Sequence, residues 1–321
     1  MNLLSYKIPV WMCVAGVVFY IIFNMNTSRT TVPCLSPKRS SESFFIPMKR
    51  PLLKQHKGCL PYDPHMKAKD LFQEYFQILK NPQWIARRPI YSISFNQLHS
   101  LLYGSNTKNI YKSWPNYHKK HFNRSYPYTS MTRLVFKSIA QELSIPLHLV
   151  VEIGSFIGKS SSNIGRVIQN NPAWADKTVL LCIDTWLGSV EHWIQERPLI
   201  GIEFGRPTIY EQFLANMIEA ELTNTVLPLS TPSLVGAQIL LRHKLFPQII
   251  FLDSAHLQGE TLVELELYWE LLQPGGILVG DDWKWIAVQC DLLRFADSVG
   301  VKPNVIKNIW YIKKEIDRDY D

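Results

Sequence analysis

One stretch of twelve residues, Val150–Ser161, constrains the fold of this chain more than any other. It reads Val-Val-Glu-Ile-Gly-Ser-Phe-Ile-Gly-Lys-Ser-Ser. An apolar run with β-branched residues meets a glycine and passes at once into a helical pattern, which predicts a strand, a tight turn and a helix N-terminus. Gly154 permits a sharp turn close to a ligand. Gly158 leaves room at the helix entry, whose free N–H groups favour polar or anionic groups. We expect Glu152, at the carboxyl end of the strand, to fix a polar group of a ligand.

Three ligand-binding patterns compete for this turn. A dinucleotide fingerprint needs G-x-G-x-x-G, and Ser155 and Phe156 break that spacing. A P-loop needs four residues between its first glycine and Gly-Lys-Ser, but three stand here, so Lys159 would be misplaced. The third pattern, E-x-G-x-x-x-G, is typical of class I S-adenosylmethionine (SAM)-dependent methyltransferases, which the segment resembles. A structural turn without a ligand remains the alternative.

Charge is unevenly distributed along the chain. Residues 1–140 contain 20 Lys and Arg but 4 Asp and Glu, a net charge of +16, whereas the remainder has a net charge of −9. Two parts with different surroundings are therefore expected. The basic part suits a membrane surface, an anionic substrate or nucleic acid. Because the sequence contains no nucleic-acid-binding motif, we expect no nucleic-acid partner.

The N-terminal residues predict a membrane segment. Ile8–Phe23 is almost purely apolar and slightly short of the roughly 20 residues that a spanning helix needs. No clear small-residue cleavage site follows, so residues 1–25 are interpreted as a signal anchor, with a cleaved signal or an organellar targeting sequence as the alternative. The short span suits the thinner membranes of the endoplasmic reticulum or Golgi. Basic residues after the span argue against a lumenal C-terminal part, so the orientation stays open.

Two segments separate this span from the rest of the chain. Residues 26–58 are rich in Ser, Thr, Pro, Lys and Arg and are expected to be a disordered linker. Residues 59–128 form an aromatic-rich extension, with a short helix expected at Asp70–Ile78 and irregular structure over 82–128. The extension is either a lid or wall of a substrate site, or a packing segment that covers a sheet edge or a dimer contact. A homo-oligomer therefore stays open.

From residue 129 to residue 315 helical and strand patterns alternate. The first helix is expected at Thr129–Leu143, capped by Thr129 or Ser130, and its apolar face comprises Leu134, Val135, Ile139 and Leu143. Further helices are expected at about 159–170, 207–221, 232–243, 259–272 and 286–299. Strands are expected at about 148–153, 178–183, 225–229, 248–252, 276–280, 304–308 and 309–313.

Such alternation predicts an α/β domain with a mostly parallel sheet of seven strands and helices on both faces. The last two strands are close together and are expected to form an antiparallel hairpin at the sheet edge. This Rossmann-like arrangement is that of the class I methyltransferase fold, which the pattern resembles.

Three further residues are candidates for cofactor binding. Asp184 ends the second strand, where an acid can hydrogen-bond both ribose hydroxyls of a nucleoside or merely cap the next turn. Trp186 could stack on a purine or simply pack. Ser230 follows the third strand, near where an adenine would sit.

Acidic residues follow two neighbouring strands. Ile249–Leu252 leads to Asp253 and, three residues later, His256, and the strand Ile277–Gly280 leads to Asp281 and Asp282. Carboxylates that lie close together repel one another unless they are protonated or bound to a metal. A small number of carboxylate ligands suits Mg²⁺, which usually keeps several water molecules in its coordination sphere. His256, with a near-neutral pKa, could take a proton from a hydroxyl. Taken singly, Asp253 could cap a loop, His256 could be a hydrogen-bonded structural histidine, and Asp281 and Asp282 could form a solvated turn.

The segment Val150–Trp283 resembles the family of macrocin-type sugar O-methyltransferases and cephalosporin-hydroxylase-like proteins. The matching residues are Glu152, Gly154, Phe156, Gly158, Ser160, Asp184, Asp253, His256, Pro274, Gly275, Gly276, Asp281 and Asp282. The resemblance implies Mg²⁺ ligands at Asp253, Asp281 and Asp282, with His256 as the base. Sugar-modifying members often have a Glu where this chain has Asp281. The residues expected to bind SAM are Glu152, Gly154, Ser155, Phe156, Gly158, Ser160, Asp184, Trp186, Ser230 and Asp253.

Together these observations predict a single-pass membrane protein that transfers a methyl group from SAM to a hydroxyl of a sugar or small polyhydroxylated compound. Two alternatives stay open. One is a hydroxylase-like enzyme with the same acidic site, and the other is a catalytically silent, membrane-tethered binding protein on a methyltransferase scaffold.

Overall fold

The computed structural model describes residues 89–113, 129–194, 201–254 and 256–316. Within these ranges no helix is both long enough and apolar enough to cross a bilayer. The predicted membrane segment 1–25, the linker 26–58 and the helix at Asp70–Ile78 lie outside them, so these remain predictions.

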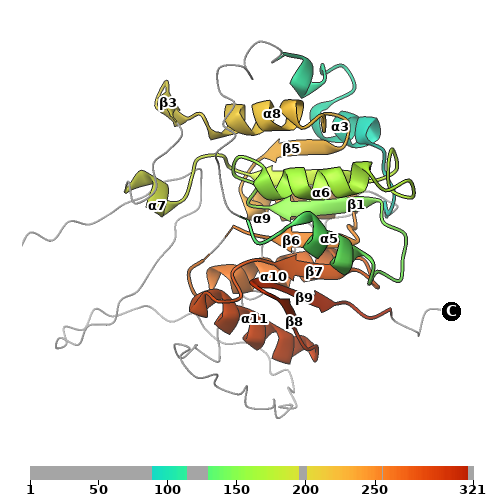
Figure 1. Ribbon diagram of the computed structural model, residues 1–321, viewed down its shortest axis with the longest axis vertical. Helices are drawn as coiled ribbons and strands as arrows, with labels where there is room; N and C mark the ends of the chain where they lie inside the picture. Colours follow the sequence, from blue (N-terminus) through green and yellow to red (C-terminus); the bar gives the residue numbers. More distant parts are fainter. Residues whose placement is uncertain (1–88, 114–128, 195–200, 255, 317–321) are drawn as a thin grey trace, which may run out of the picture. The chain divides into compact units, whose positions relative to one another are not determined.

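A seven-stranded sheet forms the centre of the domain, in the order β5-β2-β1-β6-β7-β9-β8 (Figure 1). Neighbouring strands from β5 to β7 pair in parallel, whereas β9 is antiparallel to both β7 and β8. The strands are β1 (Leu149–Ile153), β2 (Val179–Asp184), β5 (Val226–Ser230), β6 (Ile249–Leu252), β7 (Ile277–Gly280), β8 (Asn304–Ile306) and β9 (Ile309–Lys313). The predicted α/β fold, with its C-terminal hairpin at one edge, is confirmed.

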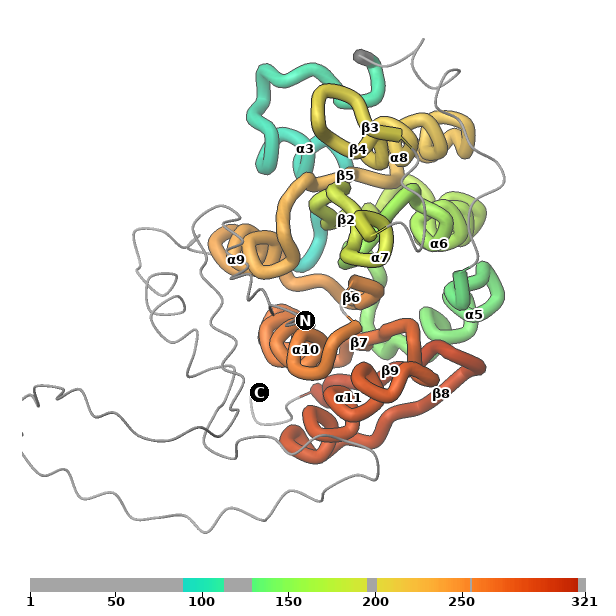
Figure 2. The backbone as a smooth tube through the Cα atoms, turned by 90° about the vertical axis from the view of Figure 1, so that its left-hand side faces the viewer, coloured from blue at the N-terminus to red at the C-terminus, as the bar shows by residue number. Residues whose placement is uncertain are grey.

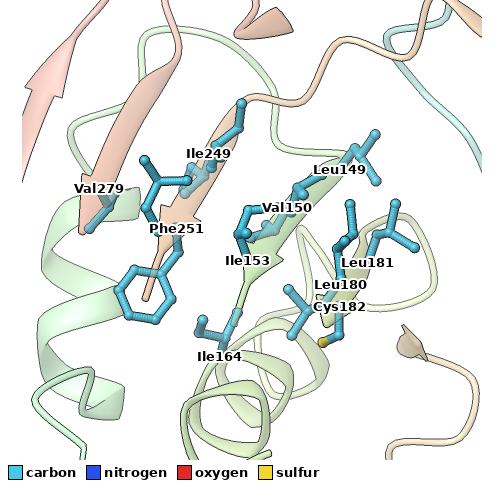
Figure 3. Packing of buried hydrophobic residues seen from close by; sticks show 14 of the residues in the cluster. Leu149, Val150, Ile153, Ile164, Leu180, Leu181, Cys182, Ile249, Phe251 and Val279 are labelled. Carbon is cyan, nitrogen blue, oxygen red and sulfur yellow. The ribbon is translucent and has the colours of Figure 1, made fainter. Parts of the chain in front are cut away.

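Helices cover both faces of this sheet (Figure 2). One layer contains α5 (Arg133–Ala140), α6 (Lys159–Gln169) and α8 (Ile209–Glu219), and the other contains α9 (Ser233–His243), α10 (Glu260–Leu271) and α11 (Ile286–Val299). Every residue of β1, β6 and β7 is buried, as expected for parallel strands covered on both sides. Figure 3 shows apolar side chains of β1, β2 and β6 gathered with Ile164 of α6.

The first predicted helix is shorter than expected. It begins after Thr132, whose Oγ1 accepts a hydrogen bond from the Val135 backbone N–H at 3.3 Å, so the predicted cap at Thr129 or Ser130 is wrong. Leu134 is 80% exposed, and Phe136 is buried instead. Val135 and Ile139 are buried as predicted, so the buried face is shifted round the helix by about one residue, towards Phe136 and Ala140.

The extension contains structure that the sequence pattern did not reveal. Helix α3 (Phe95–Tyr103) begins with a capping box between Ser94 and Gln97, and the 3-10 turn η1 (Ile110–Ser113) follows it. The hydroxyl of Tyr103 donates to the Pro228 carbonyl, and that of Tyr111 donates to the Val226 carbonyl at 2.7 Å.

These two carbonyls belong to β5, the edge strand of the sheet. Unpaired backbone groups on an edge strand otherwise invite pairing with another chain. Residues 89–113 therefore agree with the packing alternative, in which the extension covers a sheet edge. Residues 114–128 of the extension lie outside the described part, so the lid alternative stays a prediction there.

Two small elements between β2 and α8 were also not predicted. They are helix α7 (Val190–Trp193) and a hairpin made by β3 (Ile202–Glu203) and β4 (Arg206–Pro207). In Figure 1 both project beyond the arrowheads of the parallel strands.

Candidate active site

The glycines of the turn after β1 are required by the fold. Gly154 has φ +84°, and a Cβ there would lie 2.1 Å from the carbonyl oxygen of Asp253. Gly158 has φ +83°, and a Cβ there would lie 2.6 Å from Cε of Met217 on α8. The turn after β1 thus touches the turn after β6, where the acidic residues lie.

Glu152 is fully buried beneath this turn. Its Oε2 accepts hydrogen bonds from Ser155 Oγ at 3.0 Å, from Cys182 Sγ at 3.3 Å and from Ser161 Oγ. Its Oε1 is buried and has no hydrogen-bond partner in the described structure. Burial raises the pKa of this carboxyl above its usual range. An ammonium or hydroxyl group of a bound cofactor would satisfy the orphaned oxygen.

Asp184 joins the first two turns of the site. Its Oδ2 accepts a hydrogen bond from the Phe156 backbone N–H at 2.8 Å, and its Oδ1 accepts one from the Trp186 backbone N–H at 2.6 Å. Burial raises the pKa of Asp184, and these backbone donors oppose that shift. The residue therefore caps the turn, as the simpler interpretation expected, and ribose binding stays a prediction.

Of the two roles left open for Trp186, the structure shows packing. Its side chain is 2% exposed and lies against Tyr210 and Phe213, with ring centroids 4.8 and 5.1 Å away. Its Nε1 donates to the Phe156 carbonyl at 2.7 Å. Among the other candidates, Ser160 is buried in the first turn of α6, and Ser230 is exposed beside Asp184 in the register of β2 and β5.

Three side chains converge after β6 and β7. One ligand atom each from Asp253, His256 and Asp282 lies within 4.8 Å of the others, and His256 Nε2 is 2.8 Å from Asp282 Oδ2. Burial raises the pKa of Asp253 well above its usual range, and the negative charges of Asp281 and Asp282 add to the shift. These groups line a pocket, and a cation bound there would relieve the repulsion between the carboxylates.

Asp281 is held differently from the other two aspartates. Its Oδ1 accepts hydrogen bonds from the Asp282 backbone N–H at 2.7 Å and from Asn308 Nδ2 at 2.9 Å, and its Oδ2 accepts one from the Ser130 backbone N–H at 3.4 Å. The structure therefore groups His256, rather than Asp281, with Asp253 and Asp282. Asn308 lies in the β8–β9 turn, where no sequence motif marked it.

The turns of the site contain three non-glycine residues with left-handed backbone conformations. Phe156, Trp186 and Asp282 have φ of +45°, +51° and +60° and follow β1, β2 and β7. Such conformations are unfavourable for bulky side chains, by about 1–3 kcal/mol each, and concentrate at functional sites.

Sequence reasoning also missed two buried carboxylates near His256. Glu264 of α10 lines the same pocket and accepts a hydrogen bond from Ser254 Oγ at 2.6 Å. Asp291 of α11 accepts hydrogen bonds from the Gly259 and Leu262 backbone N–H groups at 2.7 and 3.0 Å. Both fix the segment that follows Asp253, but neither belongs to a pattern that marks a site, so no motif identifies them.

Comparison with known proteins decides the class of this domain. Residues 151–283 match the sequence model of a family described as a methyltransferase domain. Residues 151–283 form a methyltransferase domain. The match covers the turn after β1 and the acidic segments after β6 and β7, and it confirms the predicted enzyme class, a SAM-dependent methyltransferase. Acceptor, metal and individual site residues remain predictions.

Solved structures with a similar arrangement were also found, and three are representative. Cofactor-bound Rv0187 from MTB is 14% identical with a TM-score of 0.44, over 68% of this chain and 95% of its own. An O-methyltransferase from Bacillus cereus in complex with SAH is 14% identical with a TM-score of 0.42, over 72% and 99%. The O-methyltransferase TomG from Streptomyces achromogenes, in complex with SAM, is 14% identical with a TM-score of 0.41, over 73% and 99%. Because these TM-scores are below 0.5, the functional argument for the methyltransferase domain rests on the family match. No curated protein matches the chain.

Proposed function

We propose that this protein transfers the methyl group of SAM to a hydroxyl of a small polyhydroxylated acceptor such as a sugar. The observation that carries the proposal is the convergence of Asp253, His256 and Asp282 beside the turn after β1 in a methyltransferase domain. The cofactor would lie over the carboxyl ends of β1 and β2, where Glu152 Oε1 lacks a partner. Since methyl transfer is a direct displacement, the chain has to orient the two reactants and accept a proton.

His256 is the best candidate for that proton acceptor. Its imidazole is partly exposed in the pocket, and Trp285 lies beside the ring at a centroid distance of 5.2 Å. Asp282, at 2.8 Å from Nε2, would stabilise the imidazolium that forms when the acceptor hydroxyl gives up its proton.

The residues present fit a magnesium ion. Mg²⁺ is commonly bound through one or two carboxylates and keeps its waters, and Asp253 and Asp282 would be those ligands. A bound cation would lower the pKa of a nearby acceptor hydroxyl. Asp281 would help to position Asp282, because its Oδ1 accepts a hydrogen bond from the Asp282 backbone N–H and its carboxylate is itself held by Ser130 and Asn308. If His256 were itself a ligand, it could not also be the base.

The proposal is tested by measuring release of S-adenosylhomocysteine with a panel of neutral polyhydroxylated compounds. Asp253→Asn and Asp282→Asn should each lower kcat/KM about 100-fold, because metal ligands and oriented charges contribute on this scale. The matched control is Asp176→Asn, an exposed aspartate before β2, which should leave the rate unchanged. Equal rates in all three variants would contradict the assignment of the acidic site.

The two roles of His256 are separated by His256→Ala. As the base, its loss should lower kcat by about 100-fold or more while the affinity for Mg²⁺ is retained. A loss of Mg²⁺ affinity measured by calorimetry would instead make His256 a ligand.

We also propose that Ile8–Phe23 anchors the protein in the membrane of the endoplasmic reticulum or Golgi. The apolar composition and the length of the segment support this. Protease protection in isolated vesicles would show on which side the catalytic domain lies, and extraction of the intact protein by carbonate would argue against an integral anchor.

A further inference from the structure

Within the described residues, most exposed large apolar side chains lie at the carboxyl end of the sheet. Six of them, 45% to 68% exposed, follow strands whose ends build the site, and we refer to them as the apolar rim. The apolar rim comprises Val190, Trp193, Ile194, Leu257, Trp285 and Ile286. Exposed apolar groups gathered beside a site indicate a binding surface rather than chance.

One half of the apolar rim is held against the cofactor turn. The ring of His192 in α7 stacks on Phe156, with centroids 4.7 Å apart, and Ser189 caps the helix by a capping box with His192. Figure 2 shows α7 in front of the end of β2. Trp193 Nε1 donates to the Leu187 carbonyl at 2.7 Å, so the indole N–H is satisfied and the exposed ring surface is apolar.

The other half of the apolar rim lies beside the candidate base. The Trp285 ring packs against His256, and Leu257 follows His256 directly in the chain. The turns beside the two halves are in contact, because His192 stacks on Phe156 in the turn after β1 and Gly154 of that turn packs against the Asp253 backbone. Apolar surface therefore flanks both the cofactor turn and the acidic centre.

The centre between these halves is unfavourable for an anionic acceptor. Four carboxyl groups line the pocket, those of Asp253, Glu264, Asp281 and Asp282, and an anionic acceptor would add a further negative charge beside them. An acceptor that fits both the acidic pocket and the apolar rim has a neutral hydroxylated group that enters the pocket and an apolar group that contacts the rim.

We propose that the acceptor is a neutral amphiphile, whose hydroxyl enters the acidic pocket while its apolar part lies on the apolar rim. This inference rests on the proposed function and specifies its substrate class. It makes α7, a four-residue element between β2 and α8, a determinant of acceptor specificity.

The test compares two probes with identical hydroxyl groups, methyl β-D-glucoside and hexyl β-D-glucoside. Binding to the full-length protein in nanodiscs is measured by calorimetry with S-adenosylhomocysteine present. The hexyl compound should bind at least about tenfold more tightly, because each buried methylene contributes about 0.8 kcal/mol. Equal affinities, or no measurable binding of the hexyl compound, would overturn the inference.

Two variants locate the effect. Trp193→Ser and Val190→Ser should each reduce the preference for the hexyl compound several-fold and leave the binding of methyl glucoside and of SAM unchanged. The matched control is Leu134→Ser, which removes an 80% exposed leucine of α5 that does not belong to the apolar rim, and should keep the full preference. All replaced side chains are exposed, and thermal melts of each variant check the fold.

The outcomes separate the two proposals. Failure to bind SAM or S-adenosylhomocysteine would remove the proposed function itself. If the protein binds the cofactor and prefers the hexyl compound, but Trp193→Ser and Leu134→Ser lower that preference equally, only the inference about the apolar rim is refuted. If Trp193→Ser instead weakens binding of the protein to phosphatidylcholine vesicles and leaves glucoside binding intact, the rim contacts a membrane and the acceptor assignment is overturned.

Discussion

At position 154, both the backbone conformation and the packing require a glycine. The residue has φ +84°, which L side chains rarely adopt, and its missing Cβ leaves room for the backbone of Asp253 and Ser254. Backbone atoms cannot swing aside as a flexible side chain can. The first motif of the sequence therefore contains a glycine that positions the second motif.

We predict that Gly154→Ala lowers the free energy of unfolding by at least about 3 kcal/mol, since strain and overpacking add. Gly300→Ala is the matched control. Gly300 also has positive φ, +73°, but nothing lies within 4 Å of the position that a Cβ would take there. This second substitution should lower stability by about 1 kcal/mol. Urea unfolding of both variants provides the comparison. Equal decreases in the free energy of unfolding would show that the close contact with Asp253 does not contribute to the effect of Gly154→Ala.

Several residue-level features were inaccessible from the sequence. A pattern of residue types predicts glycines at positive φ, but it does not predict Phe156, Trp186 and Asp282 there. It placed Asp253, His256, Asp281 and Asp282 at one edge of the sheet, because carboxyl ends of parallel strands meet. Which of them converge depends on hydrogen bonds to Ser130 and Asn308, which are distant in the chain.

At the scale of elements, α10 shows how one helix positions the start of another. Its N-cap is Gly259, which has no side chain to accept a hydrogen bond from the first turn. Asp291 of α11 provides the acceptor and is fully buried. Burial raises the pKa of Asp291 to about 6, while the backbone donors of α10 oppose the shift.

This raised pKa predicts a pH dependence of stability. The folded state holds the proton of Asp291 more tightly than the unfolded state, so the contribution of Asp291 is fully present below about pH 4 and is lost as the pH rises through about 6. The free energy of unfolding of the wild type, relative to Asp291→Asn, should therefore fall by up to about 3 kcal/mol between pH 4 and pH 6.5. Urea titrations at stepped pH measure it. A difference between the two proteins that stays constant with pH would refute the assignment to Asp291, and Asp176→Asn serves as the surface control.

Across the whole molecule, long periodic segments were predictable and short or irregular ones were not. Strands such as β1 and β6 could be placed to within about one residue, because their continuous apolar runs end at glycine or aspartate. Helix α3 was missed, although Ser94 and Gln97 carry a capping box, because its surroundings are rich in aromatic residues. The two-residue strands β3 and β4 are too short for any period to appear in the sequence.

The most direct test of the central claim is calorimetric titration of the full-length protein with SAM, with and without Mg²⁺. We predict micromolar binding of SAM and additional heat when Mg²⁺ is added, because the turn after β1 and the acidic pocket are adjacent but separate. If Mg²⁺ does not change the titration, the protein has a SAM site but the proposed metal site is refuted. Absence of SAM binding under both conditions would contradict the account and leave a methyltransferase scaffold with another purpose.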